Sequence, residues 1–284
     1  RFGHNEGDEP AFTQPLMYKQ IKQQKTTRAL YADKLVAEKV MTAQEAQDDV
    51  DQFNKYLEEA FEAKDSFKPN KADYLEGAWS GLTTAPDGDR RGETAVDVDA
   101  LKKVGEVLTS TPSDFKANPK IERLLGTKKK MFESGQGFDW ATAEALAFGT
   151  LLQDGFHVRL SGQDVGRGTF SQRHAILYDQ ETEEKHIALK NINAEKTRFE
   201  VHDSPLSELA VMGFEYGYAL ADPKTLVMWE GQFGDFVNGS QVIIDQFISS
   251  GETKWLRMCG LVLMLPHGME GQGPEHSSAR LERF

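Results

Sequence analysis

The chain has 284 residues, enough for about two domains, and its composition of 39% hydrophobic and 27% charged residues excludes a disordered chain. Its 33 Lys and Arg against 45 Asp and Glu give a net charge of −12, which argues against nucleic acid or an anionic membrane surface as a partner. No stretch approaches the ~18 apolar residues of a membrane-spanning helix. The single cysteine, Cys259, forms no intrachain disulfide and fits a reducing compartment.

The N-terminal half of the sequence predicts loops and helices. Residues 1–18 hold prolines, glycines and acids in irregular order, which indicates a loop. From Thr27 the pattern is helical, and Thr42 and Glu45 form a capping box that opens an amphipathic helix. Residues 68–95, rich in Gly, Pro and charge, indicate a long linker. Two further helical patterns complete a mainly helical connector, near 97–109 and 119–134.

After Gly137 the pattern alternates between strands and helices. Asp139 caps an Ala-rich helix that is expected to end at Gly155, and Ser204 with Pro205 is expected to open another helix. Short apolar runs predict strands at 157–162, 225–229 and 260–265, the last of them buried, and a helix is expected over 240–251. Strands separated by helices of this length predict an α/β fold with a parallel sheet covered on both faces.

Ligands of such sheets bind beyond the carboxyl ends of the strands, so we expect the site in the loops that follow Leu160, Trp229 and Leu265. The helix over 206–220 carries only two charges, Glu208 and Glu215, and a buried carboxylate is costly unless it is paired or protonated. Two explanations stay open for Glu208: stabilisation by the helix dipole, or chemistry at the ligand edge of the sheet.

Aromatic and histidine side chains occupy the other two loops. Phe233 and Phe236 follow a predicted strand, as part of the core or as a platform for a ligand. His267 and His276 lie in a Gly-rich loop, where they could exchange protons with a substrate or serve as structural histidines. A zinc site made of these two and His4 lacks any known ligand spacing.

The chain resembles one family, the thiamine-diphosphate-dependent first component of the 2-oxoglutarate dehydrogenase complex. The resemblance is carried by the stretches GHNEGDEPAFTQPLMY, RLSGQDVGRGTFSQRH, LSELAVMGFEYGYA, WEGQFGDFVNG with IIDQFISSGE, and LPHGMEGQGPEHSSARLERF. It implies a transketolase-like fold in three parts: the end of a diphosphate-binding domain (1–26), a helical connector (27–136) and a pyrimidine-binding domain truncated at its C-terminal end (137–284).

The resemblance also implies roles for individual residues. Glu208 matches the glutamate that hydrogen-bonds the aminopyrimidine ring, Phe236 the aromatic residue that stacks on that ring, and Gln232 a polar contact nearby. Leu206 is a further expected cofactor contact, and Glu208, His4 and His276 are the expected catalytic residues.

The implied reaction is oxidative decarboxylation of 2-oxoglutarate by a thiamine diphosphate ylid, with transfer of the succinyl group to a lipoyl domain of the succinyltransferase component. The resemblance implies a homodimer in the bacterial cytoplasm, or alternatively in the mitochondrial matrix. The family's G-D-G…N motif for diphosphate and magnesium is absent, so the magnesium ligands are expected upstream of Arg1 and the fragment is expected to be inactive alone. Two alternatives stay open: a non-catalytic dimerisation or assembly module, and a sister dehydrogenase acting on 2-oxoadipate.

Overall fold

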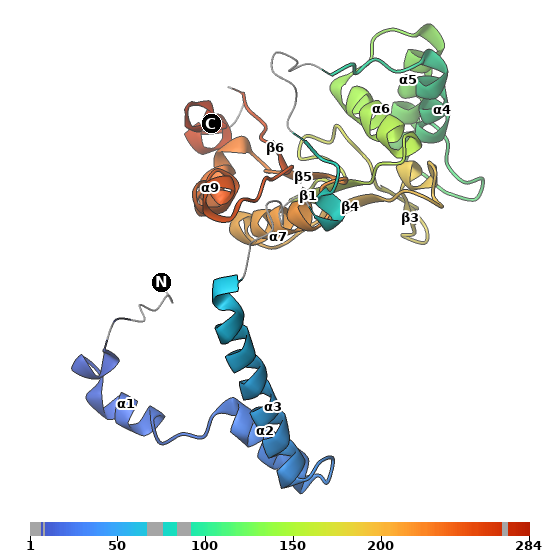
Figure 1. Ribbon diagram of the computed structural model, residues 1–284. Coiled ribbons are helices and arrows are strands. Elements are labelled where there is room, and N and C mark those ends of the chain that lie inside the picture. The colour runs from blue at the N-terminus through green and yellow to red at the C-terminus, as the bar shows by residue number, and fades with distance from the viewer. Residues whose placement is uncertain (1–6, 8, 67–75, 84–91, 269–271) are drawn as a thin grey trace. The chain divides into compact units, whose positions relative to one another are not determined.

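The computed structural model describes residues 7, 9–66, 76–83, 92–268 and 272–284, and it divides into two units, Arg1–Lys71 and Ala72–Phe284 (Figure 1). His4 and most of the predicted linker at 68–95 lie outside the described residues. Within the described part of the chain, no helix combines the length and the apolar character needed to span a membrane.

The first unit consists of helices with local capping signals. Its elements are η1 (Pro10–Phe12), α1 (Pro15–Ile21), α2 (Thr27–Ala37), α3 (Ala43–Glu62) and η2 (Ala63–Ser66). The predicted capping box is confirmed: the Glu45 N–H donates to Thr42 Oγ1 at 3.2 Å, and the Thr42 N–H donates to Glu45 Oε2 at 2.7 Å. The predicted loop over residues 1–18 is wrong in part. Pro15 opens α1, at a position where its missing N–H is not needed.

The second unit contains a four-stranded sheet, a small hairpin and the remaining helices. Its strands are β1 (Val158–Gly162), β2 (Leu177–Tyr178), β3 (Lys185–His186), β4 (Phe199–Asp203), β5 (Leu226–Glu230) and β6 (Val262–Met264). Its α-helices are α4 (Val98–Leu108), α5 (Pro119–Ser134), α6 (Trp140–Gln153), α7 (Glu208–Ala221), α8 (Gln241–Ile243) and α9 (Gly251–Trp255). Its short 3-10 helices are η4 (Gly77–Trp79), η5 (Ala188–Asn191), η6 (Gly234–Ser240), η8 (Pro274–His276) and η9 (Leu281–Arg283), and η7 (Ile244–Ile248) is a short π-helix.

The sheet is parallel, in the order β4-β1-β5-β6, which confirms the predicted α/β class. Helices cover both faces (Figure 1). On one face, Leu160 packs in a cluster with Phe148 of α6 and Val104 of α4. On the other face, Met212 of α7 packs against Trp229 of β5. The sheet is therefore buried between two helical layers, as its apolar strands require.

Two strand predictions fail at the edges of the sheet. Strand β4 is missed because only Phe199 and Val201 are buried in it, too few to mark a strand in the sequence. The run 260–265 is not a buried strand: β6 has three residues, and Val262 is 41% exposed because β5 is its one partner among the described strands.

Two helix predictions need correction as well. Helix α7 begins at Glu208, capped by Ser207, whose Oγ accepts the Ala210 N–H, because the chain at Ser204 and Pro205 is still non-helical. The helix expected over 240–251 is α8 followed by a π-turn, in which the Ser249 N–H donates to the Ile244 carbonyl. The predicted boundaries of the connector stay predictions. In the structure, α4 of that connector packs on α6.

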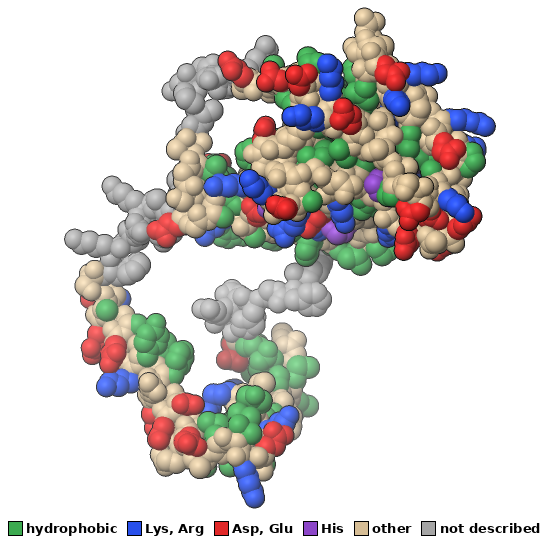
Figure 2. All heavy atoms as spheres, turned by 90° about the vertical axis from the view of Figure 1, so that its right-hand side faces the viewer, with side chains coloured by type: hydrophobic (Ala, Val, Ile, Leu, Met, Phe, Trp, Pro, Cys, Tyr) green, Lys and Arg blue, Asp and Glu red, His purple; other side chains and the backbone are tan. Residues whose placement is uncertain are grey.

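The surface charges of the second unit are mixed. On the face that Figure 2 shows, acidic and basic side chains are interspersed rather than gathered into a field of one sign.

Inside, Lys128 of α5 is 5% exposed and makes no hydrogen bond or ion pair with any described residue. Burial lowers the pKa of its ammonium group below the ordinary value, and the charges of Asp139 and Glu144 oppose only part of this shift.

Replacing Lys128 by methionine is expected to raise the free energy of unfolding at pH 7 by about 1–3 kcal/mol, because a desolvated charge is removed and the shape is kept. Between the lowered pKa and the ordinary value of 10.5, the native state binds fewer protons than the unfolded state. The stability of the wild type therefore rises with pH through this window, and the advantage of Lys128→Met shrinks. Melting curves near neutral and alkaline pH test this against the exposed control Lys130→Met, and an advantage that does not change with pH would contradict it.

Candidate functional site

The loops after β1 and β5 meet at the carboxyl edge of the sheet. At Gly162, φ is +151°, and an added Cβ would lie 2.1 Å from the Glu230 carbonyl oxygen, so only glycine permits this approach of the two strand ends. Beyond it, Gln232 Nε2 donates to Asp164 Oδ2 at 2.7 Å. The two loops that sequence analysis selected, after Leu160 and Trp229, are thus joined by a hydrogen bond that involves one of the expected site residues.

An aromatic cluster lies beside this bond. The His276 ring meets Phe233 edge to face with centroids 4.6 Å apart, and it lies 5.5 Å from the Phe236 ring. Phe233 and Phe236 are 5.7 Å apart, and Phe170 from the loop after β1 is 5.7 Å from Phe233. Phe233, Phe236 and His276 are all half-buried, so the cluster offers both an apolar surface and an imidazole to a ligand.

The C-terminal loop that carries His276 is fixed to η6 by specific contacts. The Gly234 N–H donates to the Pro266 carbonyl, and an added Cβ at Gly234 would lie 2.6 Å from the Ala279 Cβ. Arg280 Nε donates to Asp235 Oδ1 at 2.5 Å, and the carboxylate of Asp235 is buried. His267 accepts the Ala279 N–H on Nδ1 at 3.0 Å and so has a structural role. These contacts hold His276 against the two phenylalanines.

Glu208 is the first residue of α7 and is half-buried. No described residue forms a hydrogen bond or an ion pair with its carboxylate. An added Cβ at Gly239 of η6 would lie 3.4 Å from Glu208 Oε2, so the carboxylate borders the turn that carries Phe236. Leu206, just before α7, is 65% exposed. The placement suits both explanations of Glu208, since the carboxylate lies in the first turn of a helix and also at the ligand edge.

The expected site residues are therefore partly assembled. Phe236 and His276 touch, Glu208 borders the same turn, and Gln232 lies in the adjoining loop. The meeting of His276 with His4 stays a prediction, because His4 is outside the described residues.

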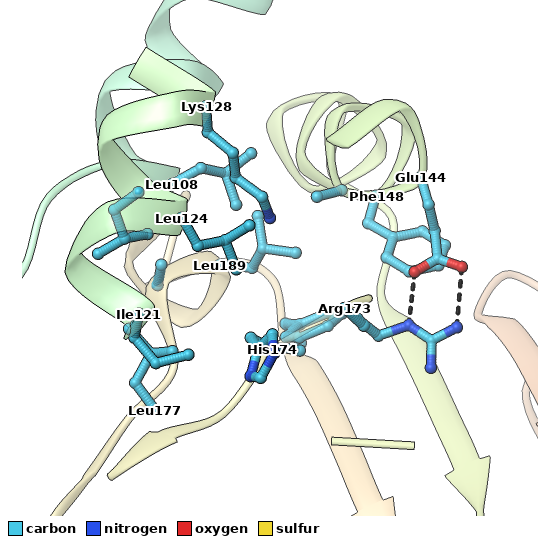
Figure 3. A pocket seen from close by; sticks show the side chains of 15 residues that line it. Leu108, Ile121, Leu124, Lys128, Glu144, Phe148, Arg173, His174, Leu177 and Leu189 are labelled. Carbon is cyan, nitrogen blue, oxygen red and sulfur yellow. Dashed lines mark hydrogen bonds and ion pairs between the residues drawn. The ribbon is translucent and has the colours of Figure 1, made fainter. Parts of the chain in front are cut away.

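A buried ion-pair network that sequence analysis missed supports this edge of the sheet. Arg173 donates to both carboxylate oxygens of Glu144 on α6, at 2.5 and 3.0 Å (Figure 3). It donates as well to both carboxylate oxygens of Glu230 at the end of β5, at 2.9 and 2.5 Å. It also donates to the Val165 carbonyl at 2.9 Å. Burial alone lowers the pKa of the Arg173 guanidinium, but these hydrogen bonds outweigh burial and raise it, so the group stays charged.

A second network lies on the α7 face. Glu215, 1% exposed, accepts two hydrogen bonds from Arg159 at 2.8 and 2.9 Å, and Arg159 also donates to Glu200 at 2.6 Å. Glu215, the second carboxylate of α7, is therefore paired, and this pairing offsets the free-energy cost of burying its charge. Among the described residues, no group of three or more His, Cys, Asp or Glu side chains is arranged to hold a metal ion.

Two family models match the chain. The model described as "Transketolase, pyrimidine binding domain" matches residues 136–284, and the one described as "Dehydrogenase E1 component" matches residues 1–72. The chain is 60% identical over its whole length to the 2-oxoglutarate dehydrogenase E1 components of Brucella anthropi and Brucella canis. It spans only 29% and 28% of those two proteins. The resemblance stated from the sequence motifs is confirmed.

Proposed function

Because the chain belongs to the transketolase pyrimidine-binding domain family, we propose that residues 136–284 form the half of a thiamine diphosphate site that receives the aminopyrimidine ring. The full-length protein would then be the first component of a 2-oxoglutarate dehydrogenase, which decarboxylates 2-oxoglutarate oxidatively and passes the succinyl group to a lipoyl domain. The observation that supports this most is the unpaired Glu208 carboxylate beside the turn that carries Phe236, at the ligand edge of the sheet.

The residues present fit the ring of that cofactor. An aminopyrimidine is flat, apolar on its faces and polar at its edge. Phe236 offers a half-buried aromatic face, and Glu208 offers a carboxylate that no described residue occupies. Gln232 is held in place by Asp164, which fixes the amide at the rim. Magnesium and the diphosphate would need oxygen ligands and backbone donors that we assign to other parts of the full-length protein.

In this proposal Glu208 accepts a hydrogen bond from the ring and exchanges a proton with it. Thiamine diphosphate, when bound, supplies a nucleophilic carbon and an electron sink for decarboxylation. The aromatic residues exclude water from the ring and orient it, and the Asp235–Arg280 pair ties the segment that carries His276 to η6.

We assign His276 to the substrate pocket, and the same role for His4, which lies outside the described residues, stays a prediction. A dicarboxylic 2-oxo acid needs cationic or donor groups for its carboxylates. The Nε2 atom of His276 has no described partner, while its Nδ1 atom faces the Gln272 carbonyl at 3.0 Å.

The exposed apolar residues Leu209, Phe214 and Val242 on α7 and α8 support a homodimer. The Brucella relatives support a bacterial cytoplasmic location.

Replacing His276 by alanine in the full-length protein is expected to lower kcat/KM for 2-oxoglutarate at least tenfold, or about 1.4 kcal/mol of transition-state stabilisation. Steady-state kinetics with an artificial electron acceptor measure this, with His202→Ala, an exposed histidine on β4, as the matched control. Wild-type kinetics in His276→Ala would contradict the assignment. Parallel assays with 2-oxoadipate separate the proposed enzyme from a sister dehydrogenase, and activity on neither acid favours an assembly module.

A further inference from the structure

A small cavity lies between α5, α6 and the segment 173–189, and its lining is mostly apolar with four polar side chains. Its volume is about 40 Å³. Leu124, Phe148, Leu177 and Leu189 line it, and the polar groups that reach it come from Lys128, Glu144, Arg173 and His174 (Figure 3). None of these residues belongs to the expected thiamine diphosphate contacts, so the cavity is separate from the candidate site.

Lys128 extends from α5 into this cavity (Figure 3). Its side chain is 5% exposed, and no described residue forms a hydrogen bond or an ion pair with it. Burial removes part of the hydration of this ammonium group, and no described residue replaces it with an ion pair, so the group favours an anion that can reach it. Lys128 is thus a ready donor of charge-assisted hydrogen bonds.

The acids nearest to this ammonium group are already engaged. Both carboxylate oxygens of Glu144 accept hydrogen bonds from Arg173, and Asp139 caps α6 by accepting the Thr142 N–H at 2.7 Å. Neither carboxylate forms an ion pair with Lys128, because its oxygens lie more than 4.0 Å from Lys128 Nζ. The protein therefore supplies long-range attraction but no direct counterion.

We propose that this cavity binds a short monocarboxylate, with the carboxylate on Lys128 and the carbon chain among Leu124, Phe148 and Leu189. A water molecule needs roughly 10–15 Å³ of such space, so the cavity admits about three groups of that size. This suits acetate or propionate and excludes long fatty acids. It also excludes dicarboxylates such as 2-oxoglutarate, because a second carboxylate would be buried among aliphatic side chains without a partner.

His174 completes the polar end of the cavity. Its Nε2 lies 2.9 Å from Ser171 Oγ and 3.0 Å from the Ser171 carbonyl oxygen. Burial lowers the pKa of this imidazole, and the nearby charges of Lys128 and Arg167 lower it further. A neutral His174 leaves Lys128 as the one cation without an ion pair among the described residues that line the cavity.

The experiment is a calorimetric titration of the full-length protein with propionate, at neutral pH and with 2-oxoglutarate saturating. We expect millimolar binding that is weakened at least tenfold in Lys128→Met and unchanged in Lys130→Met, an exposed lysine two positions along the same helix. Propionamide and hexanoate are expected not to bind, because the first lacks the charge and the second exceeds the volume. Loss of the candidate enzyme activity would not affect this result, since 2-oxoglutarate is a dicarboxylate that the cavity excludes.

Hydrogen exchange on the wild type gives a second measurement that needs no variant. Propionate is expected to slow amide exchange in α5 and in the segment 173–189. The proposal is overturned if propionate binds equally well to Lys128→Met, or if the wild type shows neither binding heat nor slower exchange. Either result would mean that water alone solvates the ammonium group.

Discussion

Replacing Glu208 by glutamine in the full-length protein is expected to lower the rate of 2-oxoglutarate decarboxylation by about 10²–10³-fold, while the protein stays folded. The amide keeps the size and shape of the carboxylate, which has no partner among the described residues. It cannot exchange a proton with an aminopyrimidine ring. Initial rates of carbon dioxide release, measured beside thermal melts, give both quantities from one preparation.

The control separates chemistry from the helix dipole. Glu122 is an exposed carboxylate in the first turn of α5, as Glu208 is in the first turn of α7. If the dipole alone explains Glu208, then both Glu208→Gln and Glu122→Gln cost about 0.3–1 kcal/mol of stability and leave turnover unchanged. A large loss of turnover confined to Glu208→Gln supports the proposed proton exchange.

Features that depend on neighbouring residues could be predicted from the sequence. Thr42 with Glu45 and Asp139 with Thr142 mark helix starts, because a cap and its donor are three residues apart. Strand β5 could be predicted because it is buried on two faces and its residues 226–229 are continuously apolar, and β1 could be predicted from the alternating apolar residues Val158 and Leu160. The loop regions of the candidate site followed from these strands.

Features that depend on distant partners could not be predicted. Arg173 meets Glu230 across 57 positions and Arg159 meets Glu215 across 56, and no spacing rule connects such pairs. In the sequence, Glu215 is a charge on an otherwise apolar helix. This was the one signal that a basic side chain, Arg159 in the structure, faces it. Edge strand β4 was missed because half of its residues face solvent or a charged neighbour, so its apolar pattern is too short to recognise.

Replacing Arg173 by methionine is expected to lower the free energy of unfolding by about 3–5 kcal/mol, because the buried Glu230 and the half-buried Glu144 would lose their shared counterion. The side chains of Arg173 and Glu230 are 6% and 5% exposed, so solvent screens their charges weakly. Arg167→Met in the same loop is the control. Its side chain is 53% exposed and lies 3.9 Å from Asp164, so its loss is expected to cost less than about 1 kcal/mol.

A graded series tests whether the cost of Arg173→Met comes from the unpaired acids. Arg173→Lys keeps the charge but cannot reach four carboxylate oxygens, so its stability is expected to lie between those of the wild type and Arg173→Met. Replacing Glu144, Arg173 and Glu230 all by methionine removes every buried charge of the network and is expected to recover part of the loss. Melting temperatures, with hydrogen exchange of β5, rank the variants. A triple variant less stable than Arg173→Met would show that hydrogen-bond geometry, rather than charge pairing, stabilises this edge of the sheet.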